Sequence, residues 1–264
     1  MIRHGRGWVP NDPRDPRNRD SEFMFALGAA EVEPRELDIE SLLPPTQDQG
    51  SNAACVGYTA AQLEYAAMVS SYEVMPPYEL PSPLVLWYMG RADAGVAALN
   101  AGTSLRTVFR LARQLGLCRD RHWPQSKHFA ANPGPTIGRL AIDQAPGLRF
   151  EWLPVTGDEA QCVAVRSAIV EGLPVGGGCL VDDDYDSVTD EVVDAPDGGE
   201  GHAQVVCGYR FDRDRGEYLY KVRNSWDLSW GVRGCCWITS RYMRTWRDLV
   251  VVTDCPGYSD EVPS

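Results

Sequence analysis

The sequence has little lysine, little histidine and no long apolar run. Of its 264 residues two are lysine, Lys127 and Lys221, and four are histidine, and the net charge at neutral pH is −12. A nucleic-acid-binding surface needs surplus positive charge to neutralise phosphates, so this balance argues against a nucleic-acid partner. No apolar stretch approaches the roughly 20 residues that a membrane-spanning helix requires, so we expect no membrane partner.

The N-terminus, MIRHGRGWVPNDPRD, lacks the apolar segment of a secretory signal, so the expected location is the cytoplasm. The hydrophobic fraction of 44% is ordinary for a packed chain. A chain of this length can form one large domain or two lobes with a substantial core.

Paired cysteine spacing is also absent. The chain has eight cysteines but no Cys-x-x-Cys pair, which zinc sites normally contain. Most of the cysteines lie within apolar strand or helix patterns, so we expect buried thiols, no metal and no organic cofactor.

Four residues supply the parts of a thiol-based acyl transfer. They are Cys55, His202, Asn224 and Gln49, in the contexts QDQGSNAACVGYTAA, GHAQVVCGY and VRNSWDLSWG. A thiol attacks as its thiolate, which a helix start and a nearby imidazolium both favour. The carboxamide of Asn224 can accept from the far nitrogen of the imidazole, and the amide of Gln49 with the backbone N–H of Cys55 can stabilise an oxyanion.

Each of these residues taken alone has a structural explanation, as a buried thiol, a hydrogen-bonded core histidine, a turn residue or a loop residue. Their joint occurrence in this order favours the catalytic interpretation. One structural alternative survives, namely a fold that is kept with little or no turnover.

The chain resembles the papain-like cysteine peptidases at these positions. The matching residues are Gln49, Gly50, Ser51 and Cys55, then Gly201, His202 and Ala203, and then Asn224, Ser225, Trp226, Ser229, Trp230 and Gly231. The histidine follows the cysteine by 202 − 55 = 147 residues, within the separation expected for that family. The extended lead-in, the Ser82-Pro83 helix start, the GTSLRTVFRLARQLGLC segment and the Trp123-Pro124 pair are similar to the bacterial, non-secreted branch. The resemblance covers most of residues 36–255.

Three positions depart from the family pattern. Asn52 replaces the usual cysteine three residues before the nucleophile, which removes half of a disulfide common in secreted members. Val56 stands where an aromatic residue often follows the nucleophile, and Ala53 and Ala54 replace Gly-Ser before it. These departures affect the expected shape of the cleft rather than the triad.

The resemblance implies an α+β, papain-like fold of two lobes with the active-site cleft between them. We expect an N-terminal arm at 1–35 and a peptidase domain at 36–264, divided into a helical lobe at about 45–140 and an antiparallel β-barrel-like lobe at about 141–256. The arm lacks periodicity, so we expect it to lie on the surface or to be partly disordered. It is short for an inhibitory propeptide and has no long helix, so zymogen control is not expected.

Local patterns predict the individual elements. Helices are expected from Cys55 to about Tyr72, from Ser82-Pro83 onward, from Thr103 or Ser104 to Gly116, and at Asp158–Glu171 before Gly172. Strands are expected at LRFEWLPV and at Leu173–Val181, Gln204–Tyr209, Tyr218–Arg223, Cys236–Thr239 and Leu249–Thr253. A Pro-containing connection at about 130–137 is expected to separate the lobes.

The resulting prediction is a cysteine endopeptidase acting on a peptide or protein substrate. Cys55 would form a thioester acyl-enzyme, His202 would move the proton, Asn224 would orient it, and Gln49 would stabilise the oxyanion. Two alternatives use the same cleft: a transpeptidase or ligase that resolves the thioester with an amine, and a catalytically silent peptide-binding homologue. The sequence leaves the side-chain preference and the oligomeric state open.

The substrate groove and its borders are predicted in outline. By resemblance, Trp226 shields the hydrogen bond between His202 and Asn224, while Ala53, Ala54 and Gly102 line the groove. Small residues there let a substrate backbone approach closely. The acidic stretch at 182–200 lacks EF-hand spacing, so a solvated loop is the plain interpretation. The sharper hypothesis is that it borders the cleft and favours basic substrates or gates entry.

Overall fold

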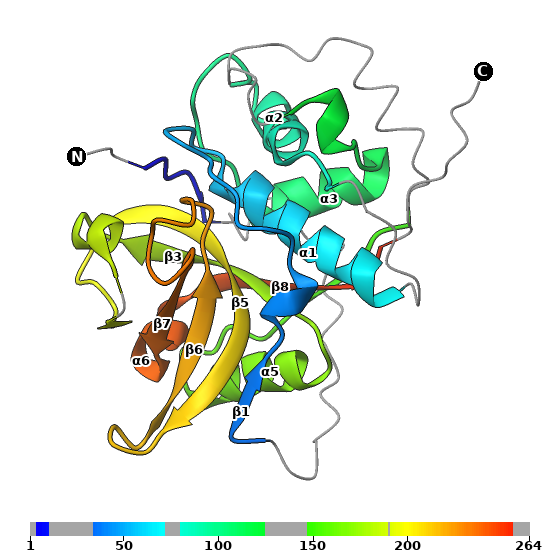
Figure 1. Cartoon of the computed structure of the whole chain (residues 1–264). Helices are drawn as coiled ribbons and strands as arrows, with labels where there is room; N and C mark the ends of the chain where they lie inside the picture. The colour runs from blue at the N-terminus through cyan, green and yellow to red at the C-terminus, as the bar shows by residue number, and fades with distance from the viewer. Residues whose placement is uncertain (1–3, 11–33, 72–79, 125–146, 190, 256–264) are drawn as a thin grey trace.

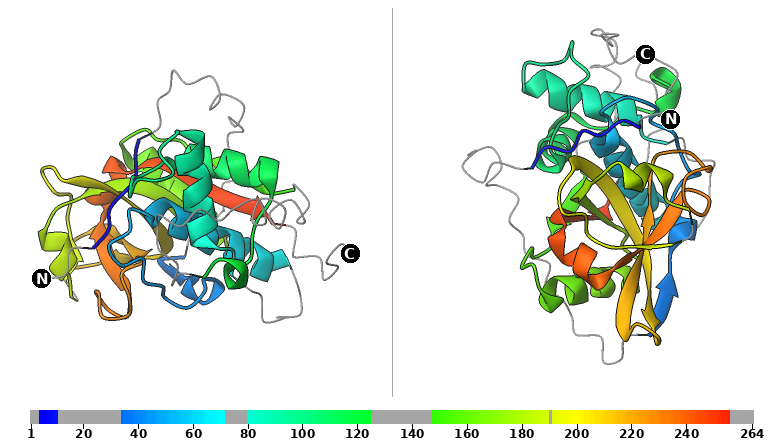
Figure 2. Two further views of the ribbon diagram at one scale, coloured as in Figure 1. Left: turned by 90° about the horizontal axis from the view of Figure 1, so that it is seen from above. Right: turned by 90° about the vertical axis from the view of Figure 1, so that its left-hand side faces the viewer.

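Two lobes lie against each other in the computed structural model, one built from helices and one from a twisted sheet (Figures 1 and 2). The structure describes residues 4–10, 34–71, 80–124, 147–189 and 191–255. The predicted α+β class is confirmed. The predicted connection at about 130–137 lies outside the described residues, and the domain boundaries at 35/36 and about 140/141 stay predictions.

The helical lobe consists of α1 (Cys55–Ser71), α2 (Pro83–Asp93) and α3 (Leu105–Leu115). Ser82 caps α2 by accepting a hydrogen bond from the Val85 amide, and Ser104 caps α3 in the same way from Thr107. Such caps satisfy backbone donors that a helix start leaves unpaired. Helix α1 is buried over most of its length and forms the centre of the lobe, so its first residue starts inside the molecule.

The β-rich lobe carries one sheet in the order β2-β8-β3-β5-β6-β7-β4, and β1 also pairs with β5. Its strands are β1 (Glu36–Asp38), β2 (Arg149–Trp152), β3 (Val175–Val181), β4 (Val192–Val193), β5 (Glu200–Asp212), β6 (Glu217–Arg223), β7 (Cys235–Thr239) and β8 (Arg247–Asp254). All pairings are antiparallel except the short β4–β7 pair. The expected barrel-like closure is wrong in detail, because in the described residues the sheet stays open, with β2 and β4 at its ends.

The sheet separates two hydrophobic cores. Along β5, Val205 and Cys207 pack into the core shared with α1, whereas Val206 packs into the core formed with α5 (Glu159–Val170) and α6 (Ser240–Thr245). Successive strand residues point to opposite faces, which explains why one strand serves both cores. Strand β5 therefore joins the helical lobe to the rest of the sheet.

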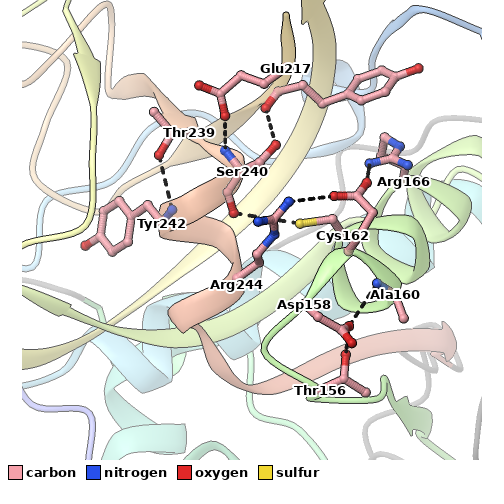
Figure 3. Close-up of polar contacts among 12 residues, drawn as sticks. Thr156, Asp158, Ala160, Cys162, Arg166, Glu217, Thr239, Ser240, Tyr242 and Arg244 are labelled. Atoms are coloured by element: carbon pink, nitrogen blue, oxygen red, sulfur yellow. Dashed lines mark hydrogen bonds and ion pairs between the residues drawn. The ribbon is translucent and has the colours of Figure 1, made fainter.

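Helices α5 and α6 are held together by a chain of ionic contacts (Figure 3). The Arg244 guanidinium of α6 donates to Glu159 at 2.9 Å, and Arg166 of α5 donates to the other oxygen of the same carboxylate at 3.1 Å. Asp158 caps α5 by accepting from the Ala160 amide at 3.0 Å. These contacts hold α5 and α6 together on one face of the sheet, and the helical lobe packs on the other face.

The main predicted elements are observed with small shifts at their ends. Strand β5 is longer than predicted, and β1, β4, α6 and the 3-10 turns η2 (Glu40–Leu42), η3 (Asp120–His122) and η4 (Asp184–Ser187) were not predicted. All eight cysteines are buried free thiols, as expected. Among the described residues no cluster of metal-ligating side chains occurs, and no helix there is both long and apolar enough to cross a membrane.

Candidate active site

Cys55 lies at the start of α1, where the helical lobe meets the sheet. Its side chain has no exposed surface. Burial raises the pKa of the thiol to about 11, and hydrogen bonds from the backbone of Ala203, Gly7, Val56 and Trp8 oppose this shift. Ala203 follows His202 on β5, so the sulfur lies beside the strand that carries the predicted base.

His202 and Asn224 form the hydrogen bond that the sequence predicts. The ring Nε2 of His202 lies 2.8 Å from Oδ1 of Asn224. A carboxamide oxygen can only accept, so Nε2 carries the proton in this pair. Nδ1 then has a free lone pair, and it is buried without a hydrogen-bond partner among the described residues. Nδ1 of His202 can therefore act as a base on the side of the ring that faces away from Asn224.

Trp226 packs against this hydrogen bond, as the resemblance implies. Its ring centroid lies 4.5 Å from that of His202, and its side chain is fully buried. A second ring, that of His4, stacks on Trp226 with centroids 4.8 Å apart. The imidazole of His202 is thus shielded from water, which keeps its contact with Asn224 strong.

Gln49 links the loop before α1 to the same cluster. Its Oε1 accepts from the Ser225 hydroxyl at 2.6 Å, and its backbone N–H donates to the Ser225 carbonyl at 2.9 Å. Its amide nitrogen Nε2 donates to the carbonyl of Gly5 at 2.9 Å. Since Ser225 follows Asn224, Gln49 lies in the same cluster as the His202–Asn224 pair, and Cys55 lies beside Ala203, the residue after His202.

The carbonyl that Gln49 holds belongs to the N-terminal arm. Residues 4–10 run between the helical lobe and the sheet, as the dark blue segment in Figures 1 and 2 shows. The amides of Gly7 and Trp8 both donate to the Gly201 carbonyl, at 3.0 and 3.1 Å, and Trp8 forms a parallel bridge with Thr103. The expectation that the arm lies on the surface is wrong for this segment, which covers the candidate site.

Trp8 anchors the arm in the wall of the β-rich lobe. Its side chain is 6% exposed, and its indole N–H donates to Asp248 at 3.2 Å. The ring lies directly over Gly178, where an added Cβ would be 2.0 Å from the ring. The glycine is therefore what makes room for the indole.

The groove residues predicted by resemblance also lie against the arm. A Cβ on Gly102 would lie 2.0 Å from the Gly7 carbonyl oxygen, so the two backbones are in close contact. Ala53 and Ala54 are buried just before α1, and a Cβ on Gly7 would lie 2.2 Å from the Ala53 carbonyl oxygen. Small residues on both sides thus permit a peptide to pass close to Cys55.

Burial keeps the candidate pair uncharged in this structure. Burial lowers the pKa of His202 to about 3, the Asn224 hydrogen bond opposes this, and the positive charges of Arg6 and His4 lower it further. With the pKa of Cys55 near 11, both groups are neutral across the physiological range. The ion pair expected from the sequence is therefore not favoured while the arm is in place, because desolvation penalises both charged forms.

The fold is that of the papain-like cysteine proteases. Xylellain, a cysteine protease from Xylella fastidiosa, superimposes with a TM-score of 0.77 at 19% identity, covering 97% of this chain and 98% of xylellain. Procathepsin L 3 from the larval midgut of Tenebrio molitor superimposes with a TM-score of 0.69 at 15% identity, covering 94% of this chain and 76% of the procathepsin. Bromelain from Ananas comosus, solved with the E64 inhibitor, superimposes with a TM-score of 0.65 at 16% identity, covering 84% of this chain and 99% of bromelain. Neither a protein-family model nor a curated protein matches the chain.

Several residues around the site were not foreseen from the sequence. They are Gly5, Arg6, Trp8, Thr103, Ser225 in its contact with Gln49, and Asp248. The only local hint is the alternation of glycine with larger residues in HGRGW, which suits a segment that must pass close to other backbones. The partners of this segment lie far away in the sequence, and no local pattern identifies them.

Proposed function

We propose that the chain is a cysteine endopeptidase that hydrolyses peptide bonds through a thioester acyl-enzyme. Cys55 is the nucleophile, and Nδ1 of His202 accepts its proton and later donates it to the leaving amine. Asn224 holds the ring through Nε2, 2.8 Å away. Gln49 and the backbone N–H of Cys55 stabilise the oxyanion, and water releases the acyl group.

One observation carries the proposal. The amide of Gln49 already donates to a peptide carbonyl, that of Gly5, at 2.9 Å. This is the contact that an oxyanion donor makes with a substrate, and it occurs in a groove closed on both sides by small residues. The cleft therefore accepts an extended peptide backbone.

The arm must leave before a substrate can enter. In the docked state the backbone of Gly7 and Trp8 lies against the sulfur, while the carbonyl at Gln49 belongs to Gly5. Undocking admits water and substrate, and removes the nearby charges of Arg6 and His4. Transfer of the Cys55 proton to His202 then becomes favourable, because the resulting ion pair is solvated.

Mass spectrometry of peptide products tests this function. In a variant with Trp8→Ala, which loosens the arm, we expect hydrolysed fragments of a mixed peptide substrate. Adding Gln49→Ala is expected to lower kcat by about 100-fold with little change in KM, because one oxyanion donor contributes about 2.7–4 kcal/mol.

The same experiment separates the alternatives. Fragments carrying an added amine such as glycinamide, in preference to hydrolysed fragments, would indicate a ligase. Absence of any product in the loosened variant would point to the silent peptide-binding homologue. An unchanged kcat in the Gln49→Ala variant would remove Gln49 from the mechanism.

A further inference from the structure

The Arg6 side chain of the arm lies in an acidic pocket beside the candidate active site. Its guanidinium donates to the Asp186 carboxylate at 2.9 Å, to the Asp182 carbonyl at 2.6 Å and to the Asp183 carboxylate at 3.2 Å. The Glu200 carboxylate lies 3.6 Å away, and the Arg6 side chain is 3% exposed. We refer to these four groups of the β-rich lobe as the acidic pocket.

We propose that the acidic pocket is a substrate subsite that selects an arginine side chain at one of the two positions flanking the cleaved bond. The inference rests on the proposed peptidase function. Gln49 holds the Gly5 carbonyl at 2.9 Å, and Arg6 is the next residue along the arm. The pocket is therefore within one residue of the point where a carbonyl would be attacked.

The acidic pocket is held in place by contacts within the β-rich lobe rather than by contacts with the arm. Within η4, the Tyr185 amide donates to the Asp182 carboxylate at 3.1 Å, and the Tyr185 carbonyl accepts from the Trp230 indole at 2.8 Å. The Tyr185 ring also packs edge-on against Trp226, with centroids 5.8 Å apart. These contacts do not involve the arm, so the pocket keeps its shape when the arm leaves.

The charge in the pocket exceeds what the arm neutralises. Asp183 and Asp186 bring two carboxylates to one guanidinium. Nε of Arg6 is buried and has no hydrogen-bond partner among the described residues, so the arm fills the pocket imperfectly. An undocked arm leaves the carboxylates facing one another, and a cationic substrate side chain relieves that repulsion.

The geometry favours arginine over lysine. The acceptors of Asp186 and Asp182 are approached by one terminal nitrogen, and those of Asp183 and Glu200 by the other. A planar guanidinium presents both nitrogens in a fixed fork, whereas a lysine ammonium is a single point charge. The Asp186 side chain is only 8% exposed, so its contact is the least screened by solvent.

The test compares internally quenched peptides that differ only by arginine, lysine or citrulline at each flanking position. Citrulline keeps the shape of arginine and removes its charge. We expect the full-length protein to prefer arginine over citrulline by tenfold or more in kcat/KM. Asp186→Asn is expected to reduce this ratio by about tenfold. The ratio does not depend on how often the arm is open, because both peptides compete with the same arm.

Two further variants guard the comparison. Glu200→Gln, whose side chain is 53% exposed, is expected to reduce the ratio by about two- to fivefold. Asp184→Asn changes an exposed acidic residue of the same loop that forms no hydrogen bond or ion pair with Arg6 in the described part of the chain, and is expected to leave the ratio within about twofold of the parent. Cleavage without preference for arginine, or an equal preference in the parent and in Asp186→Asn, overturns the subsite while leaving the peptidase function intact.

Failure of the peptidase function gives a different result. If no peptide is cleaved even by the Trp8→Ala variant, the proposed subsite is tested by measuring peptide binding instead. Fluorescence anisotropy with the arginine and citrulline peptides is then measured on Cys55→Ala/Trp8→Ala, with and without Asp186→Asn. A Kd ratio favouring arginine that falls on Asp186→Asn supports the pocket, and a ratio that does not change refutes it.

Discussion

The Cys55→Ala variant is expected to cleave peptides about 10⁵- to 10⁶-fold more slowly than its parent, when both carry Trp8→Ala to loosen the arm. The reason is that no other group can form the thioester. Among the described residues the seven other thiols are also buried, and none of them lies at the start of α1 beside β5. Initial rates on a single internally quenched peptide measure the difference.

A second thiol provides the matched control. Cys118 is a buried free cysteine whose thiol donates to the Arg119 carbonyl at 3.6 Å, a contact that serine can keep. Cys118→Ser is therefore expected to retain the parent rate within about threefold. Residual activity of Cys55→Ala above one part in about 10³ would mean that the acyl group is not carried by this sulfur.

The Trp8→Ala variant is expected to be about 100-fold more active than the unmodified chain, or more if the arm is otherwise rarely open. Truncating a packed tryptophan costs about 3–5 kcal/mol, and each 1.4 kcal/mol shifts an equilibrium tenfold. The loss falls on the docked state, because Trp8 contacts Gly178 and Asp248 only when the arm is in place. The increase stops once the arm is fully undocked.

The same release can be produced from the other side of the contact. Gly178→Ala puts a methyl group 2.0 Å from the Trp8 ring, and the three nearest atoms it would meet all belong to that indole. It should therefore raise the rate of peptide cleavage without altering the sequence of the arm. Gly198→Ala, where an added Cβ has no neighbour within 4 Å, is the control and should leave the rate unchanged. Two arm-loosening variants that are no faster than the parent would show that the arm does not limit activity.

Much of the fold follows from local signals in the sequence. Ser82 and Ser104 cap the helices that they were expected to open, and Gly116 ends α3 with φ of 83°. Short apolar runs locate the long strands, because both faces of the sheet are covered and successive residues are buried. The short elements β1 and β4 are not predictable in this way, since their pairing depends on partners distant in sequence.

The candidate site likewise contains residues that the sequence predicts and contacts that it does not. Cys55, His202, Asn224 and Gln49 could be proposed from the sequence because the chemistry restricts each to one residue type, and the structure shows the predicted contact between His202 and Asn224. The docking of the arm could not be predicted from the sequence. Its contacts join residues far apart in the chain: Arg6 and Asp186 are separated by 180 positions, and Trp8 and Asp248 by 240. Such contacts leave no periodic pattern. The arm also reverses the expected charge state of the pair, which depends on solvent access rather than on residue identity.

The pH dependence of Cys55 alkylation by iodoacetamide tests the central claim most directly. Burial raises the pKa of this thiol to about 11, so the unmodified chain should react slowly at pH 6. In Trp8→Ala we expect a rate that changes little between about pH 5 and 8, because His202 holds the sulfur as a thiolate. A short unstructured cysteine peptide, measured alongside, should instead react about tenfold faster per pH unit over that range.

Adding His202→Ala to Trp8→Ala should restore the steep profile of the free peptide. A flat profile in Trp8→Ala that becomes steep without the histidine is the result that the account predicts. A profile in Trp8→Ala that already follows the free peptide would contradict it, because the thiol would then titrate without help from the imidazole.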